Sequence, residues 1–185
     1  MSKIKITLAI AASYFIFAIL LNSVGTVILQ AINTLGVGKT EASVLEGFKD
    51  LSIAIMSFVV ASFIPRLGYK LAMLLALIVV AIACFCTAVI SEFYMFKVLF
   101  VGCGFAVVKV SVYSIIGQVT EDANSHSSLL NTIEGIFMVG VLSGYWIFTA
   151  FIDPVDSNAW LNVYYLLAVL TLLVVVSVAI APIKP

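Results

Sequence analysis

Six long apolar stretches fill nearly the whole of this chain and limit what it can fold into. They cover residues 6–33, 43–64, 69–91, 94–118, 128–152 and 160–182, and each reaches the roughly 20 apolar residues that a helix needs to cross a bilayer. Hydrophobic residues make up 64% of the 185 residues and charged residues only 10%, whereas a soluble domain is about half apolar and a quarter charged. The sequence therefore predicts an all-α polytopic membrane protein in which residues 1–185 form a single six-helix bundle in the lipid bilayer.

The same features exclude several other classes of protein. The apolar runs are continuous, as in residues 74–81, so they lack the alternation of a membrane β-barrel strand. Nine basic residues balance nine acidic ones, which leaves no positive excess for binding nucleic acid. The chain contains no phosphate-binding glycine loop, no Gly-x-Ser-x-Gly and no His-Glu-x-x-His, and its three cysteines have no metal-ligand spacing. We expect no enzyme activity, no cofactor and no metal site.

The positions of the basic residues predict the orientation of the chain. Lys3 and Lys5 precede the first stretch, Arg66 and Lys70 flank the turn after the second, and Lys184 follows the last. Six crossings place all five residues on one side, and an excess of Lys and Arg marks the cytoplasmic side. We therefore expect both termini in the cytoplasm. Short outer loops without a glycosylation sequon favour a bacterial inner (plasma) membrane.

The spacing of the stretches indicates an internal repeat. Their midpoints fall near residues 20, 54, 80, 106, 140 and 171, so the first three stretches match the last three with an offset of about 86–91 residues. Three crossings are an odd number, so the second set runs in the opposite direction and the sequence predicts two inverted three-helix repeats. Within the fifth stretch, Gly140 and Gly144 are four residues apart, which predicts close packing against a neighbouring helix.

The turn between the second and third stretches carries a motif. Residues 61–70 read Ala-Ser-Phe-Ile-Pro-Arg-Leu-Gly-Tyr-Lys, which resembles the loop signature Gly-x-x-x-Asp-Arg-x-Gly-Arg-Lys of the major facilitator superfamily at Arg66, Gly68 and Lys70. Pro65 stands where that family has its loop acid. We expect Gly68 to permit a tight turn and the two basic residues to anchor the helix ends at the phosphate layer. The resemblance implies the amino-terminal six-helix half of such a transporter.

Further motifs resemble one branch of that superfamily, the fucose–galactose–proton symporter group. They are residues 68–70, the Gly-x-Gly of residues 102–104 followed by Tyr113, and the Leu-Asn-x-x-Glu of residues 130–134. That branch carries acids inside its first and fourth helices. Here the first helix has no acid, and in the fourth helix Val107 stands where that branch has its acid. The sugar–proton mechanism of the branch therefore cannot be transferred residue by residue.

Four ionisable residues lie clearly inside the predicted spans, away from their ends, namely Lys49, Asp50, Lys109 and Glu134. A charge at the bilayer centre costs at least about 2.5–3.5 kcal/mol, so such residues face protein or water and have partners. Helix rise puts Lys109 about 13 Å and Glu134 about 9 Å from the cytoplasmic side, and Asp50 about 11 Å from the outer side. Consecutive helices are antiparallel, so we expect a Lys109–Glu134 ion pair, with Tyr113 on the same face as Lys109.

Two interpretations of these residues stay open. In the first, Lys109, Glu134 and Tyr113 line a central cavity that binds a small polar or anionic solute, with Glu134 as the proton carrier. Lys49 and Asp50 then face the outer vestibule, and the polar side chains that complete the pathway are Asn22, Gln30 and Asn131. In the second, the ion pair only fixes helix register in a membrane scaffold or subunit that does not transport.

The resemblance favours transport by alternating access, coupled to protons or another ion. Alternating access needs a second six-helix bundle that rocks against the first, on the same chain or on a separate one. Residues 181–185, Ala-Pro-Ile-Lys-Pro, resemble the start of the linker that joins two such halves. A fragment, one member of a split pair and a half that dimerises with itself are the three alternatives.

Overall fold

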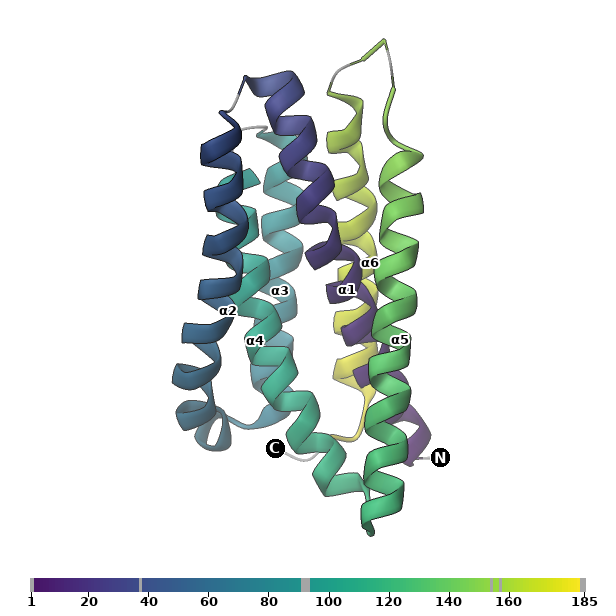
Figure 1. Ribbon diagram of the computed structural model, residues 1–185. Coiled ribbons are helices and arrows are strands. Elements are labelled where there is room, and N and C mark those ends of the chain that lie inside the picture. Colours follow the sequence, from purple (N-terminus) through teal and green to yellow (C-terminus); the bar gives the residue numbers. More distant parts are fainter. Residues whose placement is uncertain (1, 37, 91–93, 154, 157, 184–185) are drawn as a thin grey trace.

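The structure is a computed structural model, and it forms a bundle of six long helices (Figure 1). It describes residues 2–36, 38–90, 94–153, 155–156 and 158–183, so Lys184 lies outside the described residues. The elements are α1 (Ser2–Leu35), α2 (Lys39–Leu67), α3 (Tyr69–Val89), α4 (Tyr94–Val119), α5 (Ala123–Thr149), the short 3-10 helix η2 (Ala159–Asn162) and α6 (Val163–Ile180). Six helices are long and apolar enough to cross a membrane, and the described residues include no strand. The chain is an all-α integral membrane protein, as the sequence predicted.

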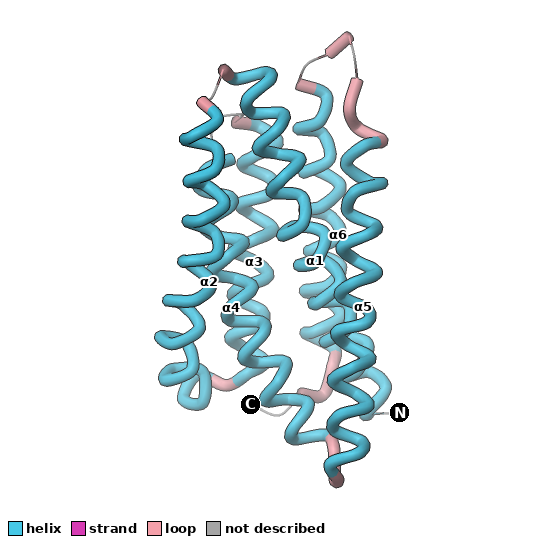
Figure 2. The backbone as a smooth tube through the Cα atoms, in the orientation of Figure 1, coloured by secondary structure: helices cyan, strands magenta, loops and turns pink. Residues whose placement is uncertain are grey.

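Short turns join the helices and bring both termini to one end of the bundle (Figures 1 and 2). Between α2 and α3 the turn is a single residue, Gly68, whose φ of 89° lies in a region that side chains with a Cβ rarely adopt. Its N–H donates to the Ile64 carbonyl at 2.8 Å, which closes the last turn of α2. Pro65 lies inside that last turn. Glycine at position 68 therefore allows α3 to start immediately after α2 ends.

The packing of the helices has the symmetry of two inverted repeats. The contact of α1 with α5 corresponds to that of α4 with α2, and the contact of α3 with α4 corresponds to that of α6 with α1. Two further contacts, α3 with α6 and α1 with α4, each join a helix to the equivalent helix of the other repeat. Helices 1–3 and 4–6 thus form two equivalent three-helix units of opposite direction, as the spacing of the sequence predicted.

Glycines allow the close helix contacts of this arrangement. A Cβ at Gly140 would lie 2.7 Å from the Ala18 Cβ and 2.8 Å from the Phe15 carbonyl oxygen, so α5 approaches α1 too closely for a larger residue. Gly144 contacts Ile19 one turn further along the same pair of helices. In α4, a Cβ at Gly104 would lie 2.7 Å from the Val80 side chain of α3. The prediction that Gly140 and Gly144 form a close-packing surface is confirmed.

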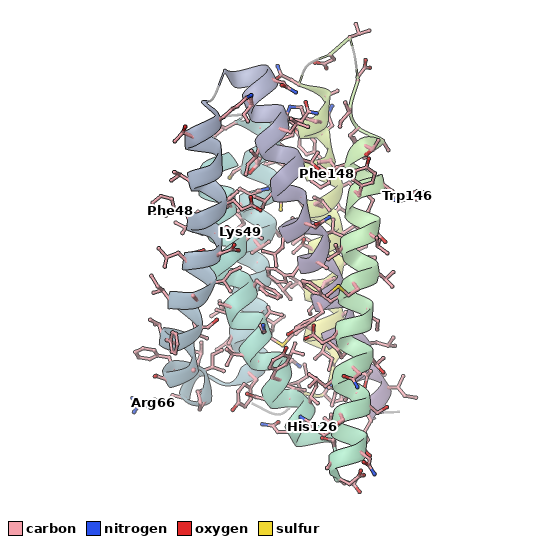
Figure 3. All side chains as sticks on the ribbon, viewed as in Figure 1. Phe48, Lys49, Arg66, His126, Trp146 and Phe148 are labelled. Atoms are coloured by element: carbon pink, nitrogen blue, oxygen red, sulfur yellow. The ribbon has the colours of Figure 1, made fainter. Side chains whose placement is uncertain are left out.

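Helix α5 begins at Ala123, earlier than the expected start at 128, because Asp122 caps it. The Asp122 carboxylate accepts a hydrogen bond from the Ser125 backbone N–H at 2.9 Å and a second one from the Ser125 hydroxyl. These bonds satisfy a backbone donor that the first turn of a helix leaves free. His126 lies in the same first turn, where its Nδ1 is 3.2 Å from the Thr120 hydroxyl (Figure 3).

We expect Asp122→Ala to lower the melting temperature of the detergent-solubilised protein, and Asp122→Asn to lower it less, because asparagine also caps helices. Hydrogen bonds from Ser125 hold the pKa of the Asp122 carboxyl below its ordinary value of 3.8. The contribution of the carboxylate is therefore complete above pH 3.8 and is lost as the pH falls through the folded-state pKa. The gap between wild type and Asp122→Asn should shrink on acidification. A gap that is constant from pH 7 to acid would contradict this assignment.

Lys70 connects α3 to the end of α6. Its ammonium donates to the carbonyl oxygens of Ala179 and Ala181, both at 2.8 Å. Ala179 lies in the last turn of α6 and Ala181 is its C-cap, where a cation is stabilised by the helix dipole. Lys70 therefore joins two helices at the end of the bundle that holds the termini, and its anchoring at the phosphate layer stays a prediction. Arg66 does remain exposed at the end of α2 (Figure 3).

Candidate functional site

Two side chains inside the membrane-spanning region meet between α4 and α5. The Tyr113 hydroxyl donates a hydrogen bond to the Glu134 carboxylate at 2.7 Å. Long helical side chains point toward the N-terminus of their own helix. Because α4 and α5 are antiparallel, Tyr113 and Glu134 reach toward each other from opposite directions. A hydrogen bond to a charged acceptor is the stronger kind and holds the carboxylate in one position.

Lys109 lies next to this pair but does not form the expected ion pair with Glu134. Ion pairs among the described residues include Lys3–Glu121 at 2.7 Å and Lys49–Asp50 at 3.4 Å, and Lys109 belongs to neither. The Lys109 ammonium is 5.9 Å from the centre of the Phe105 ring and 5.7 Å from that of Tyr113, so it lies against aromatic faces. The prediction of a direct Lys109–Glu134 contact is wrong because α4 and α5 contact each other little and Tyr113 reaches the carboxylate first.

An aromatic cluster surrounds these polar groups on the side of the bundle core. The Tyr14 ring of α1 lies 5.9 Å from Phe105, 6.4 Å from Tyr113 and 5.7 Å from Phe137, centroid to centroid. Tyr14 is only 1% exposed, and its hydroxyl has no hydrogen-bond partner of good geometry within the described part of the chain. The sequence analysis missed Tyr14. A tyrosine in an otherwise apolar first span was the signal, since a buried hydroxyl needs a polar neighbour.

The cluster lies near the middle of the two helices. Lys109 is ten residues before the end of α4, or about 15 Å along the helix, and Glu134 is eleven residues after the start of α5, or about 17 Å. Both side chains are half-buried, and Tyr113 is 39% exposed. The site is therefore an open face formed by α1, α4 and α5, with its charged groups well away from both ends of the helices.

The other predicted residues are distributed along the bundle. Asn22 of α1 lies on an exposed surface, where its amide donates to the Val141 carbonyl of α5 at 2.9 Å. Asn131 is exposed one turn before Glu134. Gln30 is half-buried toward the far end of α1. Asn22 lies on α1 with Tyr14, and Asn131 lies on α5 with Glu134. Gln30 is also on α1, but it is 16 residues beyond Tyr14.

Lys49 and Asp50 form a separate group on α2. The Lys49 side chain is 13% exposed and lies toward the bundle (Figure 3), whereas the Asp50 side chain is 69% exposed. The Lys49 carbonyl lies opposite Gly102, where α2 and α4 approach closely. Lys49 and Asp50 therefore form an ion pair within α2, separate from the Tyr113–Glu134 pair between α4 and α5.

Lys97 of α4 is a buried cation that the sequence analysis did not single out. It is 0% exposed, and its ammonium donates to the Tyr164 hydroxyl at 2.9 Å and lies 4.6 Å from the centre of that ring. Tyr164 of α6 and the packing of α3 against both α4 and α6 enclose it.

No cluster of three or more His, Cys, Asp or Glu residues that could hold a metal ion occurs in the described part of the chain. The side chains of the candidate site are an acid, a phenol, an amine and aromatic rings. These groups can bind a polar or charged small molecule by hydrogen bonds, cation–π contacts and ring stacking.

The bundle resembles one half of a known transporter. The crystal structure of a D-xylose-proton symporter matches it with a TM-score of 0.75 and 14% sequence identity, over 100% of this chain and 49% of the symporter chain. This chain thus spans about half the length of that protein, which is a transporter and not an enzyme. At 14% identity the likeness shows the fold alone, that of one half of this symporter, and it does not single out the fucose–galactose group. No family model matches the sequence, and no curated protein does.

Proposed function

We propose that this chain is one half of a transporter that moves a small polar or anionic solute across the membrane by alternating access, coupled to protons. The observation that carries the proposal is the Tyr113–Glu134 hydrogen bond, 2.7 Å long, on an open face near the middle of the spans. An acid at that depth is costly, so such acids are rare in spanning helices and mark solute or ion pathways. The matching transporter fold supports the same function.

In this proposal each residue has a role. Glu134 takes up and releases the coupling proton, and Tyr113 holds the carboxylate in place. Lys109, against the rings of Phe105 and Tyr113, attracts the anionic or electron-rich part of the solute. Asn22 and Asn131 provide further hydrogen-bonding groups along α1 and α5, and the aromatic cluster forms the wall behind them.

A second six-helix bundle is part of the proposal. Only 11% of the α2 span and 22% of the α5 span are buried inside this bundle, compared with 50% for α3 and 56% for α4. A partner that covers α2 and α5 would enclose the polar face between two bundles. We propose that this partner is another copy of the chain or a separate half, with both termini on the cytoplasmic side of a bacterial inner membrane.

The experiment is transport by the purified chain in proteoliposomes. The oligomeric mass of the protein is first determined in nanodiscs. The same protein is then tested for uptake of labelled D-xylose, lactate and phosphate under an inward proton gradient. A dimer of twice 19.9 kDa that accumulates one of these solutes supports a self-sufficient half-transporter. A monomer without uptake indicates that a separate half is required. A stable dimer without accumulation of any of the three favours the non-transporting scaffold.

A further inference from the structure

An apolar groove of about 340 Å³ lies between α2 and α3, with α4 as its floor. Phe63 and Leu67 of α2, Leu75 and Val79 of α3 and Val107 of α4 are among its lining residues, and almost no polar atom reaches its surface. The groove is open because α2 packs along α4 and contacts α3 little, although only Gly68 separates the two helices. Such a surface offers water no hydrogen-bond partners, so within a bilayer it takes up hydrocarbon.

Arg66 lies at one end of this groove. Val59, Phe63 and Arg66 are spaced by four and three residues, which places them on one stripe of α2, and the first two line the groove. Arg66 is exposed and points away from the bundle (Figure 3), and the ion pairs of the described residues do not include it. A guanidinium at the end of a spanning helix reaches the phosphate layer and can bind a phosphate with two parallel hydrogen bonds.

The groove faces away from the candidate site. On α4, Val107 lines the groove whereas Lys109 belongs to the polar cluster, and two residues along a helix correspond to a rotation of about 200°. The polar face is formed by α1, α4 and α5, and the groove by α2, α3 and the opposite side of α4. The second bundle proposed above covers α2 and α5 but not α3, so the groove stays open to lipid on the α3 side.

We propose that this groove is a binding site for one anionic phospholipid, with an acyl chain along α2 and α3 and the headgroup phosphate on Arg66. The apolar lining fits a hydrocarbon chain, and Arg66, the residue next to the lining residue Leu67 in the last turn of α2, supplies a cation for the headgroup. A zwitterionic lipid carries its own ammonium group beside the phosphate. An anionic lipid carries no such competitor, so the single arginine favours it.

Native mass spectrometry of the full chain in detergent, titrated with phosphatidylglycerol or phosphatidylcholine, tests the proposal. We expect wild type to bind one phosphatidylglycerol more tightly than phosphatidylcholine. Arg66→Gln should weaken phosphatidylglycerol binding about tenfold and remove the preference between the two lipids. The matched control is Lys5→Gln, which removes an exposed cation at the same end of the bundle, and it should change binding less than about twofold.

A second variant tests the acyl-chain half of the site. Val79 is 43% exposed, so Val79→Trp fills the groove without disturbing the core, and its melting temperature without lipid should match wild type. We expect it to weaken phosphatidylglycerol binding about tenfold, because several methylenes lose their contact. The proposal is overturned if Arg66→Gln binds like wild type, if Lys5→Gln weakens binding as much as Arg66→Gln, or if Val79→Trp, still folded, binds normally.

Discussion

Replacing Gly140 with alanine should destabilise the bundle by about 1–3 kcal/mol, because the added methyl group has no space between α5 and α1. Its Cβ would lie 2.7 Å from the Ala18 Cβ and 2.8 Å from a backbone oxygen of Phe15, and the backbone atom cannot move alone. Gly140→Leu should prevent α5 from docking and give little monodisperse protein. The measurement is the free energy of unfolding in mixed detergent micelles.

Two other glycines of α5 serve as controls for this prediction. A Cβ at Gly144 would lie 3.3 Å from the nearest atom of Ile19, so Gly144→Ala should cost less than Gly140→Ala. Gly135 has nothing within 4 Å of such a Cβ, and Gly135→Ala should be neutral or stabilising by up to about 1 kcal/mol through helix propensity. If the three substitutions had equal effects, close packing of α5 on α1 would not be the cause.

Much of the fold could be predicted from the sequence because a membrane restricts the possible structures. Long apolar runs must be helices, an odd number of crossings inverts the second repeat, and Gly68 and Gly140 occupy positions that exclude a side chain. The helix starts were less well predicted, since α1 and α2 begin four residues and α5 five residues before the expected stretches. The capping bonds of Asp122 add five residues before the expected start, which moves Glu134 about 8 Å further along the helix than predicted.

The partners within the candidate site could not be predicted in the same way. Lys109 and Tyr113 share a face of α4, one turn apart, and both fit the depth of Glu134. Which of them reaches the carboxylate depends on how far α4 and α5 diverge, and that is set by the packing of each on other helices. The burial of Lys97 likewise depends on Tyr164 of α6, which is 67 residues away in sequence. Periodicity predicts the face and depth of a residue, and tertiary packing decides its partner.

Replacing Glu134 with glutamine should abolish proton-driven accumulation of the transported solute, down to the level of protein-free liposomes. In the wild type the Tyr113 hydroxyl is 2.7 Å from the Glu134 carboxylate. Glutamine has nearly the same shape and can still accept this hydrogen bond, but it cannot bind and release a proton in the transport cycle. The fold should therefore be retained. Uptake of D-xylose, lactate or phosphate under a proton gradient is compared with the melting temperature of the same preparation.

Two further variants separate the chemistry of this site from general effects on the bundle. Tyr113→Phe removes one charge-assisted hydrogen bond and should reduce uptake about tenfold without abolishing it. Glu46→Gln removes an exposed acid of α2 outside the site and should leave uptake unchanged. Normal accumulation by Glu134→Gln would exclude this carboxylate as the proton carrier. A large loss of melting temperature without a specific loss of uptake would instead give the Tyr113–Glu134 pair the structural role that a non-transporting scaffold requires.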